Sequence, residues 1–158
     1  MSEKEAFEAL RRAIKEFYSK EKSLSKLKGV ENSSVFRIGC YLRPLIEIGN
    51  KNITVDTEYN KRGKAYKGFV PDLIVHERQT INNIMAVEFK GRWVNRDSKD
   101  IKDDFKKLID ITTNSYNYKL GVFIYLNKET AEYKLFRNGK ELESAEMQEL
   151  DLNDKEIF

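Results

Sequence analysis

Two short apolar runs that end in charge carry the side chains best suited to chemistry in this sequence. The first run, 70–75, has Asp72 near its start, and the second, 85–90, ends with Glu88 and Lys90. Side chains two positions apart on a strand share a face, so Glu88 and Lys90 would point the same way. If the runs pair as antiparallel strands, Asp72 lies beside them. Two carboxylates and an amine at one sheet edge could hold a divalent cation and activate water against a phosphodiester.

Each of these residues also has a simpler structural interpretation. Asp72 follows a proline, as turn residues commonly do. Glu88 and Lys90 could form a salt bridge at a strand end. For one such residue taken alone, the structural role is the commoner one. All three at the ends of adjoining strands favour a functional site.

The bulk composition is that of one globular domain, expected to span residues 1–158. Hydrophobic residues make up 40% and charged residues 35%, and no apolar run is long enough to span a membrane. Residues 1–28, a predicted helical extension, are rich in Lys, Arg and Glu and lack the apolar core of a signal peptide, so a cytoplasmic location is expected. The single cysteine, Cys40, is expected to be a buried helix residue. The single histidine, His76, is expected to be a partly exposed strand residue.

The charges are unevenly distributed along the chain. The net charge is +3, but residues 141–158 hold seven acidic residues and one basic residue. We therefore expect a basic body and an acidic tail, an arrangement compatible with a polyanionic partner.

Apolar periodicity and turn residues predict the order of elements. Helices are expected over 3–20, from Asn32 or Ser33 to Gly49, and from Ser98 or Asp100 to 113, with a polar connector over 23–29. Strands are expected over 53–59, 69–77, 84–90 and 120–126, followed by a hairpin around Asn138-Gly139. This order favours a mixed sheet covered by helices.

The motif Pro71-Asp72, followed on the next strand by Glu88-Phe89-Lys90, resembles that of the PD-(D/E)XK nuclease superfamily. The resemblance covers about residues 31–126 and includes Glu58-Tyr59-Asn60 and Asn82-Asn83, as in small bacterial and phage-associated members. It implies an α/β, restriction-endonuclease-like fold: a mixed β-sheet flanked by helices, with core order αβββαβ. The first helix and the C-terminal hairpin would be additions to that core.

The resemblance also implies roles for individual residues. Asp72 and Glu88 would ligate Mg²⁺, for which Mn²⁺ could substitute, and the main-chain carbonyl of Phe89 would be a third ligand. Lys90 would orient or help deprotonate the attacking water, or offset charge on the phosphate. Members often add a glutamate from the helix before the sheet, and Glu31 is the first choice here.

Two other glutamates compete with Glu31 for this role. Glu47 lies near the other end of the same helix, and Glu58 lies at the end of the first strand. The sequence alone leaves the choice among them open.

Several basic residues could contact nucleic acid. Lys61, Arg62, Lys64 and Lys67 form a basic, glycine-bearing loop, which could equally be a solvated connection. Arg92 follows the second motif, and Lys107 resembles a basic residue that the superfamily helix can supply, although a solvated helix face also explains it.

The resemblance thus implies a Mg²⁺-dependent nuclease that hydrolyses phosphodiester bonds in DNA. Two alternatives stay open: a catalytically inactive nucleic-acid-binding module on the same fold, and a protein–protein interaction domain of a mobile-element or defence system. Cleavage of both strands would suggest a homodimer, but no coiled coil is evident in the sequence.

Overall fold

The computed structural model describes residues 1–57, 70–113, 116–142 and 146–153. Its helices are α1 (Glu3–Lys20), α2 (Lys22–Lys26), α3 (Glu31–Glu47) and α4 (Lys99–Ile111). Its strands are β1 (Ile53–Thr57), β2 (Leu73–Glu77), β3 (Asn83–Gly91), β4 (Tyr118–Leu126), β5 (Ala131–Arg137), β6 (Lys140–Leu142) and β7 (Gln148–Glu149). None of these described helices is long and apolar enough to cross a membrane.

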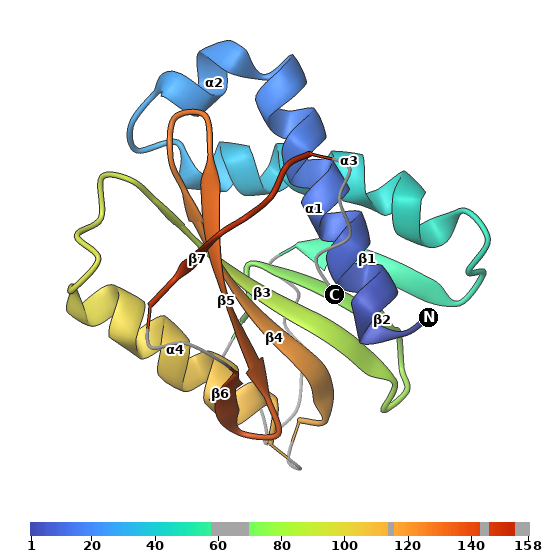
Figure 1. The fold of residues 1–158 in the computed structure, drawn as a ribbon. Coiled ribbons are helices and arrows are strands. Elements are labelled where there is room, and N and C mark those ends of the chain that lie inside the picture. Colours follow the sequence, from blue (N-terminus) through green and yellow to red (C-terminus); the bar gives the residue numbers. More distant parts are fainter. Residues whose placement is uncertain (58–69, 114–115, 143–145, 154–158) are drawn as a thin grey trace.

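All the described strands form one mixed sheet (Figure 1). Its order is β1-β2-β3-β4-β5-β6, and β7 pairs with β5. Neighbouring strands are antiparallel except β3 and β4, which are parallel. The order α3, β1, β2, β3, α4, β4 confirms the expected αβββαβ core, and α1 and the β5–β6 hairpin are the expected additions.

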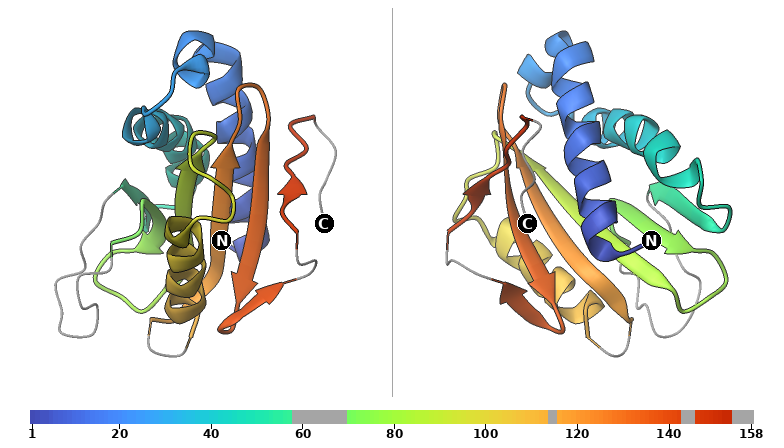
Figure 2. Two further views of the ribbon diagram at one scale, coloured as in Figure 1. Left: turned by 90° about the vertical axis from the view of Figure 1, so that its left-hand side faces the viewer. Right: turned by 45° about the vertical axis from the view of Figure 1, so that its right-hand side comes forward.

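Helices cover both faces of the sheet and divide the core in two. One cluster packs α1 and α3 against residues such as Met85, Val87 and Phe89 of β3. The other packs α4 against Ala86 of β3 and against β4 and β5. Both views of Figure 2 show α4 lying apart from α1 and α3. Side chains alternate along a strand, so Glu88, two residues after Ala86, also faces α4.

The α3 helix differs from its sequence prediction at its start. It begins at Glu31, with Val30 at the N-cap and no side-chain cap, and the Ser34 hydroxyl instead donates to the Val30 carbonyl. Pro44 lies inside the helix without ending it. Pro44 removes a donor to the carbonyl of Cys40, four residues before it. Cys40 is exposed, not buried as expected, so water can replace that donor.

Two segments for which no element was predicted contain secondary structure. The connector 23–29 overlaps the short helix α2, and the acidic tail contains β7. Leu150 is buried behind β7, and Arg11 of α1 donates to the main-chain carbonyls of Asp151 and Asn153. Residues 146–153 of the tail are therefore part of the folded domain.

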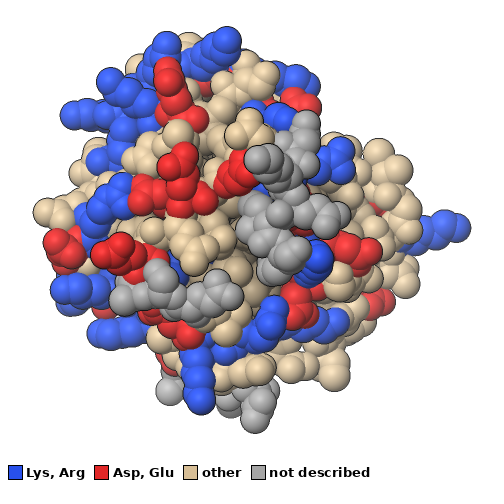
Figure 3. All heavy atoms as spheres, viewed as in Figure 1, with Lys and Arg blue, Asp and Glu red and all other residues tan. Residues whose placement is uncertain are grey.

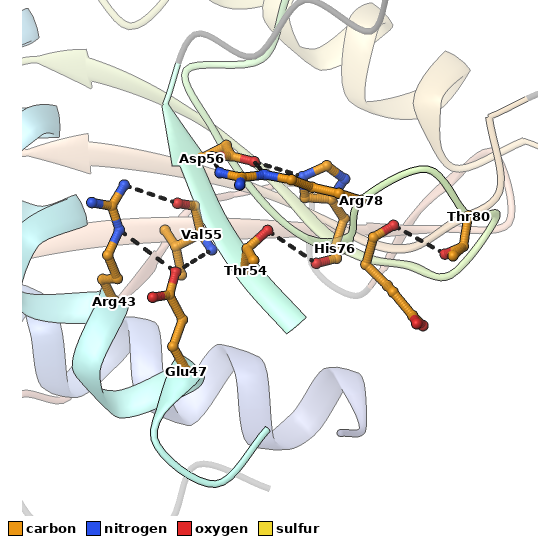
Figure 4. A network of polar contacts seen from close by, with 9 residues as sticks. Arg43, Glu47, Thr54, Val55, Asp56, His76, Arg78 and Thr80 are labelled. Atoms are coloured by element: carbon orange, nitrogen blue, oxygen red, sulfur yellow. Dashed lines mark hydrogen bonds and ion pairs between the residues drawn. The ribbon is translucent and has the colours of Figure 1, made fainter. Parts of the chain in front are cut away.

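A buried ionic network joins β1 to the end of β2 (Figure 4). His76 was expected to be partly exposed, but it is fully buried and lies with Nε2 2.8 Å from Asp56 Oδ2. Arg78 donates from Nε to the same oxygen at 2.9 Å. The pKa of Asp56 is lowered to about 2. The hydrogen bond from Arg78 is the main cause, burial acts in the opposite direction, and the hydrogen bond with His76 lowers the pKa further.

We predict that Asp56→Asn destabilises the protein at neutral pH by about 1.5 kcal/mol or more, the scale of hydrogen bonds to a buried charge. The folded-state pKa of Asp56, about 2, lies below its ordinary value of 3.8. The contribution of the carboxylate is therefore present above pH 4 and is lost as the pH falls through 2. Urea unfolding of both proteins between pH 7 and pH 2 should show the difference shrinking towards acid. Asp97→Asn, at an exposed carboxylate, is the control, and a difference that is constant with pH would contradict the prediction.

Candidate active site

The edge of β3 beyond its pairing with β2 forms the centre of the candidate site. The last paired residues are Leu73 and Val87, which confirms the expected antiparallel pairing. Beyond this pair, Asp72 Oδ2 accepts a hydrogen bond of 2.8 Å from the main-chain N–H of Phe89. The carboxylate thus takes the place of a strand carbonyl, because an unpaired main-chain donor at a sheet edge needs an acceptor.

Glu31 accepts a hydrogen bond from the next main-chain N–H that points outward from the same edge of β3. Its Oε2 accepts from the main-chain N–H of Gly91 at 2.9 Å, and its Oε1 lies 3.7 Å from Lys90 Nζ. The first turn of α3 therefore brings Glu31 to the end of β3, as proposed for the upstream glutamate.

Glu47 lies elsewhere, at the other end of α3. Its Oε1 accepts from the Val55 N–H at 3.1 Å and lies 3.6 Å from Arg43 Nε (Figure 4). Glu47 therefore joins the helix to β1. Glu58 is outside the described residues.

Glu88 and Lys90 point towards α4, as the strand alternation predicts. Lys90 Nζ lies 2.9 Å from Asp104 Oδ2, and Lys107 Nζ lies 4.0 Å from Glu88 Oε2. Lys107 also donates to Asp104 Oδ1 at 2.9 Å. The Lys107 ammonium thus lies among the acidic groups, and not only on a solvated helix face.

Asp104 is a further residue of this site that was not predicted from the sequence. Its side chain is 3% exposed and pairs with both lysines. Its spacing in the sequence could have indicated its burial. Asp104 recurs with the apolar residues on one face of α4, whose buried residues are Ile101, Asp104, Leu108 and Ile111. A carboxylate in an apolar helical stripe indicates a buried ionic partner.

Burial and mutual repulsion raise the pKa values of the acidic groups. Burial, then Asp72 and Asp104, raise the pKa of Glu88 to about 9. Burial also raises the pKa values of Asp72 and Glu31, although the Phe89 N–H and Lys90 oppose this for Asp72. For Lys90, burial lowers the pKa, but Asp104 and Glu31 outweigh it and the pKa lies above its ordinary value.

One buried oxygen in this cluster is left without a partner. Glu88 Oε1 has no hydrogen-bond partner among the described residues. Among the residues that the structure describes, no group of three or more His, Cys, Asp or Glu residues is arranged to hold a metal ion. Near this oxygen, the charge of Asp72 is one cause, after burial, of the raised pKa of Glu88.

The other predicted contacts to nucleic acid are placed only in part. Lys61, Arg62, Lys64 and Lys67 lie outside the described residues. Arg92 is half-buried and donates from Nη2 to the Lys26 carbonyl of α2 at 2.8 Å. Arg92 therefore ties the end of β3 to α2.

Comparison with known proteins gives little beyond this geometry. No family model matches the sequence, and no curated protein matches it. Among solved structures, it is similar to one chain of the DrdV–DNA complex determined by cryo-electron microscopy, with 18% identity and a TM-score of 0.47. The match covers 89% of this chain and 12% of that one, so this chain spans only a small part of the protein that it matches.

We predict that Glu88→Gln stabilises the metal-free protein. The folded-state pKa of Glu88, about 9, lies above its ordinary value of 4.5, so wild-type stability falls as the pH rises from 4.5 to 9. Glutamine keeps the shape without this penalty, and the gain should exceed about 1 kcal/mol at pH 8. Urea unfolding with a chelator should show the gain growing with pH. Glu47→Gln is the matched control, and a Glu88→Gln protein less stable than the wild type would contradict the prediction.

Proposed function

We propose that this protein is a metal-dependent nuclease that hydrolyses phosphodiester bonds in DNA, with Mg²⁺ as its cofactor. The observation that carries the proposal is the convergence of Asp72, Glu88 and Lys90 at the end of β3. The αβββαβ order of elements supports placing the chain in the PD-(D/E)XK superfamily, as does the motif with Pro71-Asp72 just before β2 and Glu88-Phe89-Lys90 on β3.

The acid pair fits a hard divalent cation. The charge of Asp72 adds to burial in raising the pKa of Glu88, and Glu88 Oε1 is a buried oxygen without a hydrogen-bond partner among the described residues. Two carboxylates suffice for Mg²⁺, which keeps several waters and phosphate oxygens as its other ligands. The Phe89 carbonyl stays a predicted third ligand. When bound, the cation would neutralise the acid pair and lower the pKa of a coordinated water.

The lysine supplies the positive charge of the chain itself. The Lys90 ammonium would donate to the attacking water or to a non-bridging phosphate oxygen, where charge develops in the transition state. The water oxygen would bond to phosphorus and its proton would pass to solvent. The bond from phosphorus to the 3′-oxygen would break, and the 3′-oxygen would take up a proton from solvent. Asp104 and Glu31 hold Lys90 from two helices and keep it charged, so they are positioning residues.

The surface beside the site suits a DNA backbone. Lys20, Lys22, Lys26 and Lys28 are exposed in and around α2, and Figure 3 shows Lys and Arg side chains gathered over this part of the molecule. Arg92 bonds to α2, so this basic surface adjoins the end of β3. Contacts to phosphates would make binding strongly dependent on salt.

We predict that the wild type cuts plasmid and linear DNA with Mg²⁺ or Mn²⁺ and not with a chelator. Asp72→Asn, Glu88→Gln and Lys90→Met should each lower the rate at least about a hundredfold, the scale for removing one preorganised electrostatic group. Glu47→Gln, on the same helix as Glu31, should cut like the wild type. Equal cleavage by all variants would refute the catalytic assignment. Salt-dependent binding with no cleavage would instead indicate an inactive binding module.

We also predict direct metal binding in the absence of DNA. Calorimetric titration with Mn²⁺ should give one binding event, which Glu88→Gln weakens at least about tenfold, since even residues behind the ligands change affinity by that amount. Glu47→Gln should leave the affinity unchanged. Unchanged affinity in Glu88→Gln would place the ion elsewhere.

A further inference from the structure

A small hollow opens beside the acid pair, on the side of α3 and β1. It has a volume of about 160 Å³ and is lined by Asn32, Val35, Phe36, Thr57 and Asp72. Apolar walls with a few polar groups are typical of ligand sites. The hollow is smaller than the roughly 300–1,000 Å³ pockets that hold drug-sized molecules, so its ligand is small or is part of a larger one.

Phe36 is exposed at this hollow. Its relative exposure is 59%, whereas Phe7, Phe17, Phe89, Phe123 and Phe136 are all buried. Leu27, Ile48 and Ile81 are the other large apolar residues found exposed in the described ranges 1–57, 70–113, 116–142 and 146–153, so Phe36 is the one aromatic among them. Folding therefore leaves a ring face available at this position.

The hollow shares Asp72 with the proposed catalytic site. Asp72 lines it and also binds the Phe89 N–H beside Glu88. Bases and phosphates alternate along a DNA strand, so a strand with a phosphate at the acid pair places a neighbouring base close to Asp72. Asn32 lies one helical turn before Phe36 and shares the same side of α3.

We propose that this hollow binds one unpaired base of the DNA strand, stacked on Phe36, with the Asn32 amide against the edge of the base. An aromatic ring accepts any base, because every base has a flat π-face. An amide both donates and accepts hydrogen bonds, as the edges of bases require. A base within a duplex must first leave its pair and its stack, which costs free energy.

The inference rests on the proposed nuclease function and adds its substrate class: DNA that is single-stranded or unpaired next to the cleaved bond. A protein partner is less well matched, since stable protein interfaces bury about 800 Å² on each partner. The hollow is small, and the Asp72 carboxylate forms part of its wall.

The test measures binding separately from cleavage. All proteins carry Glu88→Gln, so that cleavage does not consume the probe, and circular dichroism confirms that each is folded. Fluorescence anisotropy measures Kd for a labelled single-stranded oligonucleotide, for the same strand with one abasic site at each position in turn, and for the blunt duplex. The added substitutions are Phe36→Ala, Phe36→Leu and Phe36→Trp, with Ile48→Ala at the other end of α3 as the control.

Phe36→Ala and Phe36→Leu should weaken single-strand binding about tenfold or more, since neither has a ring on which a base can stack. Phe36→Trp and Ile48→Ala should stay within about threefold of the parent, and duplex binding should change little in any variant. At one position, an abasic site should weaken binding by the parent but not by the Phe36→Ala protein, because base and ring are lost together.

The subsite is refuted if the parent does not bind the single strand, if Phe36→Ala binds it as tightly as the parent does, or if single-strand and duplex binding weaken alike. A separate assay with native Glu88 keeps the two proposals apart. Cleavage without any effect of Phe36 would refute only the subsite. Binding that depends on Phe36, without cleavage, would refute only the nuclease.

Discussion

The two main-chain N–H groups of Phe89 and Gly91 are the constraint from which the candidate site follows. Both lie on β3 beyond its last pair with β2, and both donate to carboxylates, those of Asp72 and Glu31. An edge donor without an acceptor would be costly. The end of the pairing thus brings acidic groups from two distant segments to one point.

The parallel pairing of β3 with β4 keeps this edge rigid. It continues through Gly91, beyond the point at which β2 has left the sheet. One side of β3 is therefore fixed by a buried strand while the other is free for side chains. A site held on a strand in this way is more precise than one held on loops.

The site concentrates negative charge at the expense of stability. Three carboxylates, those of Glu31, Glu88 and Asp104, share the ammonium groups of Lys90 and Lys107. The Asp72 carboxylate, which accepts from the Phe89 N–H, adds a fourth acidic group. Burial, and then the charges of Asp72 and Asp104, raise the pKa of Glu88. Proteins tolerate such arrangements mainly where function requires them, because stability elsewhere offsets them.

Sequence patterns predicted the features that depend on local backbone geometry. They missed the contacts that form only when helices and strands pack against one another. Strand alternation fixed the shared direction of Glu88 and Lys90, and the hairpin turn Asn138-Gly139 has the expected positive φ at both residues. Asp104 was missed because its partner, Lys90, becomes a neighbour only when α4 packs on the sheet. His76 was misjudged for the same reason, since its burial depends on Asp56 of the neighbouring strand.

The sequence also leaves open the structure of segments that fold only against the rest of the chain. Residues 146–153 look polar and acidic in sequence, but Leu150 is buried and Arg11 of α1 binds their carbonyls. The choice between Glu31 and Glu47 was open because both lie on one helix. In the structure, Glu31 lies at the end of β3 and Glu47 lies at β1.

The most direct test of this account is a crystal of the protein soaked in Mn²⁺, with anomalous scattering used to locate the ion. The account predicts a single strong peak between the carboxylates of Asp72 and Glu88, within bonding distance of both. A map with the ion elsewhere, or with none in fully soaked crystals, would contradict it.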